Sequence, residues 1–344
     1  MEAVLTTMTT GEALVDNVTA SSCERLSSAG TITLGVVLYL ISIITIAGNI
    51  LVITSFSIEK SLRSFGNYFI VNLSIADLII GVLMAFYIPY FLTGCWTLTR
   101  PGCIAFQVLD YAVPLASTWN IALISVDRYW SVIHALEYRV KMTTRRAMLL
   151  MTVPWLIGFS FYAPSVIGWE HWTGVQQVPD DQCYVEFFNN VPYLISNSVL
   201  EFIIPFVLVL TINLLIYINI RRRSRQALGM TANSSTSSSS STNTLSRDRK
   251  TARALAILVG IFLLTWAPYS FSALVNPICD FCIPSLWFDI VFWLLWINST
   301  INPLIYALLQ IKFRNTFLRI ITCGRKSRNT VRPVNKFSPN TVSS

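Results

Sequence analysis

Four acidic positions lie inside stretches that are otherwise apolar, and they are the residues of this sequence best suited to do chemistry. They are Asp77, Asp110, Asp127 with its neighbour Arg128, and Glu201. A charged side chain in hydrocarbon is costly, so such residues usually face a bundle interior or a water-filled cavity. Each is therefore a candidate for binding a ligand, an ion or a partner.

Asp110 and Glu201 could together bind a ligand that has a hydrogen-bond donor at each end. Asp110 lies seven residues beyond Cys103, which is roughly 10 Å along a helix at 1.5 Å per residue. A ligand ammonium would gain Coulomb attraction there and cation–π contact with aromatic faces. The alternative is that each carboxylate bonds only to a neighbouring helix.

Asp77, in NLSIADLIIG, is a candidate for a hydrated sodium or proton site. Other oxygen-bearing side chains are expected at the same mid-membrane depth, namely Asn49, Ser117, Asn298, Ser299 and Asn302. A packing network satisfied by water is the alternative, and the two interpretations are compatible.

The elements that position these residues are membrane-spanning helices. Of the 344 residues 53% are hydrophobic and only 12% are charged, whereas soluble domains carry about a quarter charged residues. Seven apolar stretches are each long enough to cross a ~30 Å hydrocarbon core. We expect spans at about 32–57, 67–92, 104–133, 147–169, 192–220, 252–277 and 286–309. The fold class is an all-α membrane protein, a seven-transmembrane helix bundle.

The distribution of basic residues sets the orientation. Of 25 Lys and Arg residues, only Arg25 and Arg100 fall on the N-terminal side of this topology. The positive-inside rule then puts the N-terminus outside the cell and the C-terminus in the cytoplasm. The net charge of +8 is thus a property of the cytoplasmic face, suited to anionic lipid or a cytosolic partner and not to nucleic acid.

Six of the seven cysteines fall on the outer side, where disulfides persist. A bridge from Cys103 to Cys183 would pin the long outer loop across the mouth of the bundle. Cys279 and Cys282 are expected to form a local bridge, because no histidine nearby supports a zinc site. Cys23 and Cys95 would then form the remaining pair.

Two modification sites and the tails complete the expected organisation. Asn17 begins a glycosylation sequon on the outer side, and Cys323 on the cytoplasmic side is suited to palmitoylation. Residues 1–31 form an extracellular tail without a cleavable signal peptide. The expected order after it is the bundle at 32–310, with a disordered serine-rich inner loop at about 226–247, a short amphipathic eighth helix at 311–323, and a cytoplasmic tail at 324–344.

Six short motifs occur in order, one in each of six expected spans. They are GNILV at 48–52, NLSIADL at 72–78, DRYWSV at 127–132, Trp155, WAPY at 266–269 and NPLIY at 302–306. Together they resemble the rhodopsin-like family of G-protein-coupled receptors over about residues 35–320. The resemblance implies a plasma-membrane receptor with heterotrimeric G protein, arrestin and receptor kinases as partners, in contact with membrane lipid.

The resemblance also implies roles for individual residues. Asp110 would pair with a ligand amine, as in aminergic receptors, and Asp77 would bind an allosteric sodium ion with Ser117, Asn298 and Asn302. A switch that meets the G protein would consist of Asp127, Arg128, Tyr129 and Tyr306. Aromatic walls of the ligand pocket would come from Tyr111, Trp266, Tyr269, Phe292 and Trp296.

The sequence resembles two subfamilies of these receptors, and the two imply different ligands. TGVQQVPDDQCYVEFFNN at 173–190 and INSTINP at 297–303 resemble muscarinic acetylcholine receptors. Glu201, Ser270 and Trp296 depart from that pattern and resemble the third and fourth histamine receptor subtypes, which couple to inhibitory G proteins. Pro114 and the short inner loop fit neither subfamily.

Chemistry favours histamine, whose ammonium and imidazole give it two donor ends for Asp110 and Glu201. The predicted function is therefore a receptor for a biogenic amine, most of all histamine, that activates inhibitory G proteins. The alternative is a receptor for acetylcholine or another amine. An enzyme is disfavoured, because both histidines, His134 and His171, lie outside the spans, and a transporter is disfavoured because no paired halves are visible.

Overall fold

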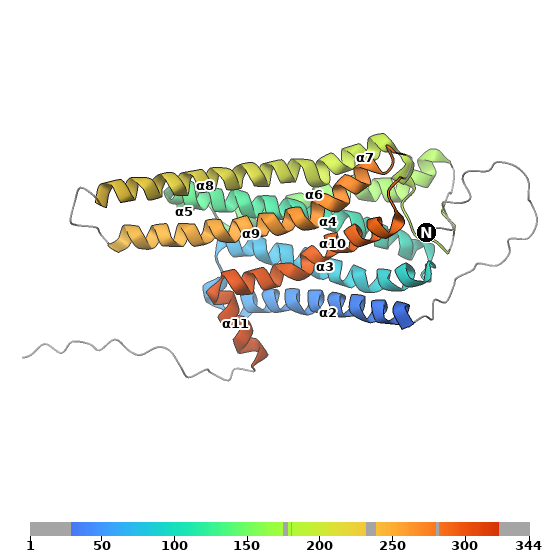
Figure 1. The fold of residues 1–344 in the computed structure, drawn as a ribbon, viewed down its shortest axis with the longest axis horizontal. Helices are drawn as coiled ribbons and strands as arrows, with labels where there is room; N and C mark the ends of the chain where they lie inside the picture. The colour runs from blue at the N-terminus through green and yellow to red at the C-terminus, as the bar shows by residue number, and fades with distance from the viewer. Residues whose placement is uncertain (1–28, 175–177, 180, 232–238, 280–281, 323–344) are drawn as a thin grey trace, which may run out of the picture.

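The computed structural model describes residues 29–174, 178–179, 181–231, 239–279 and 282–322. Over these ranges long helices run side by side as a bundle (Figure 1). The bundle is formed by α2 (Ala29–Ile58), α3 (Phe65–Thr93), α4 (Arg100–Ile133), α6 (Thr144–Thr173), the segment α7–η3–α8 (Val191–Ser198, Val199–Ile203, Ile204–Thr231), α9 (Ser239–Val275) and α10 (Ser285–Leu309). Shorter elements are η1 (Lys60–Leu62), α5 (Ala135–Lys141), η2 (Glu186–Asn189) and α11 (Ile311–Ile321). The predicted seven-helix bundle is confirmed.

Six of these helices are apolar enough over the described residues to cross a membrane. The exception is α4, which carries Asp110, Asp127 and Arg128. Its buried polar side chains are tolerated because α4 packs against α3, α6 and α8, which shield it from lipid. The helix that looks least suited to lipid is therefore the one that holds the candidate functional residues.

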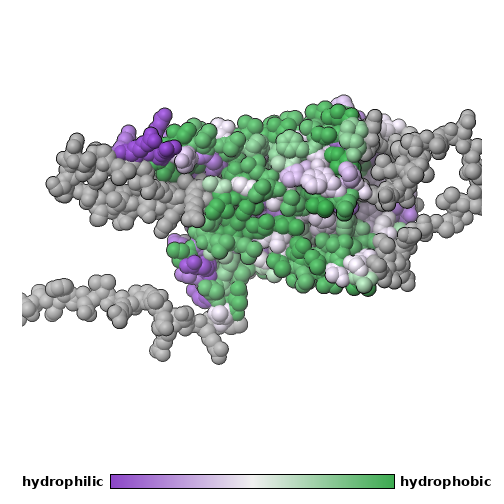
Figure 2. Space-filling model, in the orientation of Figure 1, coloured by the Kyte–Doolittle hydropathy of each residue, from purple (hydrophilic) through white to green (hydrophobic). Residues whose placement is uncertain are grey.

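The surface of the bundle agrees with a membrane position. Hydrophobic residues cover the shared length of the helices, and hydrophilic ones gather at the end where α8 and α11 lie (Figure 2). On the hydrophobic surface, large apolar side chains such as Ile43, Leu156 and Leu264 are more than half exposed. In water such a surface would aggregate, whereas in a bilayer it is covered by acyl chains.

The helix that carries Glu201 is interrupted by one wide turn. Val199–Ile203 form a π-helix between α7 and α8, and Pro205 is the second residue of α8. Proline has no backbone N–H, so it cannot make the usual bond to the carbonyl four residues earlier. A π turn at such a point changes the direction of the side chains within it, and here it includes Glu201.

The inner loop differs from its prediction. A disordered segment was expected at about 226–247, but α8 continues to Thr231 and α9 begins at Ser239. The two helices pack against each other and extend together beyond the bundle (Figure 1). Serine and threonine are only mildly unfavourable in a helix, and packing between helices can outweigh such a weak preference. The contact between α8 and α9 therefore explains why helix extends into a segment whose composition predicts a loop.

The helix after the bundle is confirmed as α11. It buries Phe313, Thr316 and Phe317 against the bundle and leaves Lys312 and Arg314 exposed. Arg319 Nη2 lies 3.2 Å from Glu59 Oε2 on the first inner loop. This alternation is the expected pattern of a helix that lies in the membrane interface.

Candidate functional site

Glu201 is held by a tyrosine from another helix. The hydroxyl of Tyr162, on α6, donates to Glu201 Oε2 at 3.0 Å and also lies in hydrogen-bond contact with Asn197 Oδ1. Tyr162 is fully buried. A carboxylate that accepts a hydrogen bond is less costly to bury than a bare one, so this tyrosine helps Glu201 to stay inside the bundle.

Asp110 is less well satisfied. Its Oδ1 is buried and has no hydrogen-bond partner within the part of the chain that the structure describes. The carboxylates of Asp110 and Glu201 also act on each other electrostatically, as like charges that repel. A cation placed between them would remove this repulsion and pair the free oxygen.

A small cavity lies beside Glu201. It has a volume of about 20 Å³, which is room for one or two water molecules and not for an amine ligand. Its walls are Tyr111, Leu194, Asn197, Ser198, Glu201, Phe202, Tyr269, Ser270 and Ala273. The pocket is thus nearly closed in this conformation, and side chains must move before a ligand can enter.

The predicted aromatic walls form three groups. Tyr269, Phe292 and Trp296 pack in series, with ring centroids 5.9 Å and 4.7 Å apart. Trp266 lies with Phe262 at 5.7 Å in a separate group. The third group is Tyr111 with Tyr162, at a ring-centroid distance of 5.2 Å.

A further aromatic residue, Tyr87 on α3, joins the first group. Its ring lies 5.4 Å from that of Phe292 and 5.3 Å from that of Trp296. Tyr87 could not be selected from the sequence, because a tyrosine in an apolar helix does not indicate which residues it will contact.

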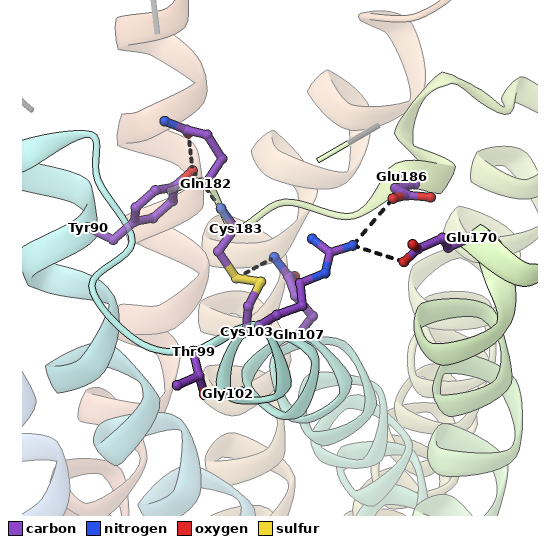
Figure 3. Close-up of a disulfide and its surroundings, with 10 residues drawn as sticks. Tyr90, Thr99, Gly102, Cys103, Gln107, Glu170, Gln182, Cys183 and Glu186 are labelled. Atoms are coloured by element: carbon purple, nitrogen blue, oxygen red, sulfur yellow. Dashed lines mark hydrogen bonds and ion pairs between the residues drawn. A yellow bond between two sulfur atoms is a disulfide. The ribbon is translucent and has the colours of Figure 1, made fainter. Parts of the chain in front are cut away.

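The mouth of the bundle is closed by the outer loop. The predicted disulfide between Cys103 and Cys183 is present and ties this loop to the start of α4 (Figure 3). The side chain of Gln182 extends the attachment, because its Oε1 accepts from the Tyr90 hydroxyl at 3.0 Å. The predicted local bridge between Cys279 and Cys282 is present as well.

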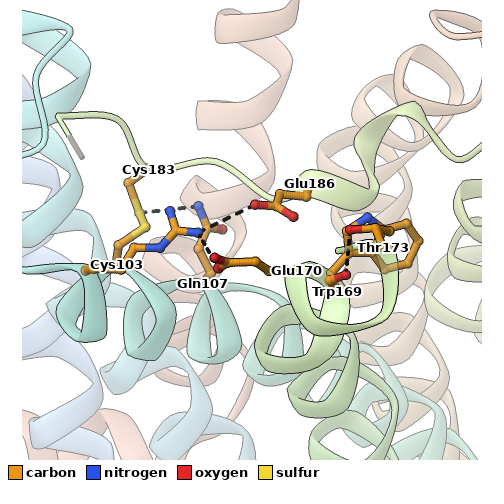
Figure 4. A network of polar contacts seen from close by, with 8 residues as sticks. Cys103, Gln107, Trp169, Glu170, Thr173, Cys183 and Glu186 are labelled. Atoms are coloured by element: carbon orange, nitrogen blue, oxygen red, sulfur yellow. Dashed lines mark hydrogen bonds and ion pairs between the residues drawn. A yellow bond between two sulfur atoms is a disulfide. The ribbon is translucent and has the colours of Figure 1, made fainter. Parts of the chain in front are cut away.

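An ion-pair cluster lies beside the Cys103–Cys183 disulfide. Arg100 Nη2 lies 3.4 Å from Glu170 Oε2 on α6 and 3.5 Å from Glu186 Oε1 in the loop (Figure 4). The next residue, Phe187, is fully buried and its ring lies 5.4 Å from that of Tyr111. Together, the disulfide and Arg100 hold the loop so that Phe187 reaches down to the pocket wall.

Asp77 lies where α3, α4 and α10 meet. Asn302 Nδ2 donates to Asp77 Oδ2 at 2.8 Å, and the hydroxyls of Ser117 and Ser299 lie beside the carboxylate. Asp77 Oδ1 is buried without a partner in the described ranges. Asn298, expected in this set, instead donates to Thr265 Oγ1 on α9 at 2.9 Å.

These oxygens fit a sodium ion. Hard cations take oxygen ligands, and the orphaned Asp77 Oδ1 would gain one. Where the chain is described, no three His, Cys, Asp or Glu side chains gather as a metal cluster. One carboxylate with neutral hydroxyls is a set suited to a monovalent ion.

The inner end of α4 carries the Asp127–Arg128 pair. Arg128 Nε lies 3.8 Å from Asp127 Oδ2, and Tyr138 on α5 donates its hydroxyl to Asp127 Oδ1 at 2.6 Å. Burial, together with the Asp127 carboxylate, raises the pKa of Tyr138, so this hydroxyl keeps its proton as a donor. Tyr306 is buried on α10, and Tyr129 lies partly buried beside the pair.

The profile of the 7 transmembrane receptor (rhodopsin family) matches residues 48–306. This range is most of the chain and includes all of the site residues described in this subsection. The chain belongs to this family. It is therefore a multi-pass membrane receptor, of a family that acts through G proteins and is typical of the plasma membrane, and it is not an enzyme.

Among curated proteins the receptor is similar to muscarinic acetylcholine receptors. The M5 receptor of Rattus norvegicus is 37% identical over 190 residues, which cover 55% of this chain and 36% of the relative. The M1 receptor of Homo sapiens is 28% identical, with 84% of this chain and 89% of the relative covered. The M3 receptor of Gallus gallus is 38% identical over 167 residues, 48% of this chain and 26% of the relative. The alignments to M5 and M3 thus span about a third or less of those receptors.

Three residues predicted to be modified or bridged lie outside the described ranges of the receptor. They are Asn17, Cys23 and Cys323. Glycosylation, the pairing of Cys23 with Cys95, and palmitoylation remain predictions, as does the tail at 324–344. Of the tail predicted at 1–31, the last three residues belong to α2, and the rest lies outside the described ranges.

Proposed function

We propose that the receptor binds a small biogenic amine between α4 and the π turn at Val199–Ile203, with histamine as the first candidate. The proposal is carried by two carboxyl groups that interact electrostatically, Asp110 and Glu201. Asp110 has a buried oxygen without a partner in the described ranges, and Glu201 lines the small cavity. In the proposed complex, Asp110 pairs with the ligand ammonium, and Glu201 accepts a hydrogen bond from the N–H of an imidazole.

The chemistry of Glu201 supports a ligand with two donor ends. Histamine offers a cation at one end and a ring N–H at the other, so each carboxylate gains a charge-assisted hydrogen bond. A choline ester has no second donor and would leave Glu201 facing apolar groups, with only Tyr162 and Asn197 as compensation. Tyr162 supports this role of Glu201, because its hydrogen bond fixes the orientation of the carboxylate.

Acetylcholine is the second candidate, and the comparisons favour it. The similar curated receptors reported above are named as muscarinic acetylcholine receptors. The cluster of Tyr87, Tyr269, Phe292 and Trp296 would also suit a quaternary ammonium through cation–π contacts. In that case Glu201 is a structural residue bonded to Tyr162.

We further propose that agonist binding shifts the receptor toward a state in which Arg128 leaves Asp127 and meets a G protein of the inhibitory class. An agonist must bind that state more tightly than the resting state, because otherwise it shifts no population. Sodium, held by Asp77 with Ser117, Ser299 and Asn302, would favour the resting state. Arrestin and receptor kinases are proposed as further partners.

A ligand panel on cells that express the wild type, Asp110→Asn and Glu201→Gln tests the amine. We expect histamine to activate the wild type, Asp110→Asn to lose the response to every amine, and Glu201→Gln to weaken histamine about tenfold or more. The last figure corresponds to one hydrogen bond to a charged group. Surface expression of each variant is measured in parallel. A strong acetylcholine response that Glu201→Gln leaves unchanged would overturn the histamine assignment.

A further inference from the structure

Gly66, the second residue of α3, lies directly against the Asp127–Arg128 pair. A Cβ atom built on Gly66 would stand 2.4 Å from Arg128 Nη2, 2.7 Å from Arg128 Cζ and 2.8 Å from Asp127 Oδ2. Atoms at such distances overlap, so any side chain at this position would force the guanidinium to move. In this conformation the guanidinium occupies the space that a side chain would need.

The backbone does not require glycine here. Gly66 lies in α3 with an ordinary helical conformation, and positive φ angles occur among the described glycines only at Gly94 and Gly174. Alanine is favoured over glycine in a helix by about 0.5–1 kcal/mol. The use of glycine at this point is therefore explained by space and not by conformation.

The pair has few other restraints among the side chains that the structure describes. Asp127 is buried and also bound by Tyr138, whereas the Arg128 side chain is about a quarter exposed. Arg128 Nε and Asp127 Oδ2 are 3.8 Å apart, which is too long for a direct hydrogen bond. The space left free by the missing Cβ of Gly66 is thus what allows the guanidinium to lie close to Asp127.

We propose that Gly66 is a positioning residue of the activation switch. It provides the seat in which the Arg128 guanidinium rests on Asp127, and a methyl group in this seat releases Arg128 without a ligand. The two nearest atoms are the far end of the flexible Arg128 side chain and the third is Asp127 Oδ2, so Arg128 yields first and α3 keeps its place. The inference depends on the G-protein part of the proposed function and is independent of which amine binds.

Ligand-free nucleotide exchange on purified inhibitory G protein tests this proposal. We expect Gly66→Ala to raise the basal exchange rate about fivefold, the lower end of typical coupling between sites. Gly260→Ala is the matched control, because a Cβ there meets nothing within 4 Å, and it should leave the rate unchanged. In an Asp127→Asn background, where the pair is already broken, Gly66→Ala should add much less. A wild-type basal rate in Gly66→Ala, or an equal increase in both backgrounds, would overturn the proposal.

A second measurement covers the case in which Gly66→Ala fails to reach the cell surface. Arg128→Ala removes the two nearest of the three atoms that would clash and leaves Asp127 Oδ2 at 2.8 Å. If Arg128 causes the main clash, the double variant Gly66→Ala/Arg128→Ala should regain the surface expression of Arg128→Ala alone. Continued loss in the double variant would show that the methyl group clashes with something other than Arg128, and it would overturn the proposal. This measurement requires no G protein, so it distinguishes failure of the seat from failure of the proposed coupling.

Discussion

Tyr162 narrows the choice of ligand more than any aromatic wall does. Its hydroxyl donates to Glu201 Oε2 at 3.0 Å from a fully buried position, so the carboxylate faces the pocket with one oxygen already engaged. A ligand donor that approaches Glu201 therefore meets a carboxylate whose orientation Tyr162 has already fixed. An aromatic wall, in contrast, accepts many cations with similar energy.

Replacing Tyr162 with phenylalanine should therefore act selectively. Tyr162→Phe removes one hydrogen bond to a charged group, and we expect affinity for histamine to fall about tenfold, equivalent to the ~1.5–3 kcal/mol of such a bond. Amines without a second donor should bind as before. Competition binding with both kinds of amine measures this difference. Tyr217→Phe is the control, since Tyr217 is exposed to lipid on α8. Equal losses for both kinds of amine would mean that Tyr162 supports only the fold.

At the level of residues, the sequence predicted candidates better than contacts. Glu201, Asp110 and Asp77 could be selected because a carboxylate in an apolar run is costly wherever it points. Tyr162 and Gly66 could not be selected, since a tyrosine or glycine in a helix is ordinary. Their roles depend on which helices become neighbours, and that is a property of the folded bundle.

Among the elements, α4 combines the largest number of candidate functional positions with a proline in its interior. It runs from Arg100 to Ile133 through Pro114, four residues after Asp110. Proline cannot donate to the carbonyl of Asp110, and its ring crowds that carbonyl. The turn that carries Asp110 is therefore less restrained than an ordinary helical turn.

Pro114→Ala should stabilise the receptor and weaken amine binding. The new N–H can bond to the carbonyl of Asp110, and removing a helix-interior proline relieves up to about 3 kcal/mol. Tightening this turn moves the carboxylate from its present direction, so the melting temperature should rise while amine affinity falls. Thermal unfolding and ligand binding on the purified receptor measure the two effects. Pro154→Ala on α6 provides the control, with a change in stability and an unchanged affinity. A rise in affinity for Pro114→Ala would contradict this role.

The helices themselves were predictable to within a few residues, because apolar length sets the spans directly. The π turn at Val199–Ile203 was not, since its signal is a single proline that also fits a plain helix start. The inner ends of α8 and α9 were misjudged for a related reason. Composition predicted a loop at about 226–247, whereas α8 continues to Thr231 and α9 begins at Ser239, and the two helices pack together.

For the whole molecule, one helix joins the two ends of the receptor. Asp110 lies in the outer half of α4 and Asp127 at its inner end, 17 residues apart, which is about 26 Å. Asp77 and Ser117 lie between them, at the junction with α10. An ion at this junction would contact three helices at once and so bias their arrangement.

Sodium should therefore lower agonist affinity, and Asp77 should be required for this effect. If sodium favours the resting state and an agonist the active one, each must weaken the other by the same factor. We expect a five- to tenfold loss of agonist affinity in sodium chloride relative to N-methylglucamine chloride at equal ionic strength, which keeps electrostatic screening constant. Asp77→Asn should abolish the difference, because the ion loses its only carboxylate. Asp289→Asn, at the outer end of α10, should retain the full difference. A sodium effect that survives in Asp77→Asn would place the ion elsewhere, and its absence from the wild type would leave Asp77 as a packing residue that Asn302 satisfies.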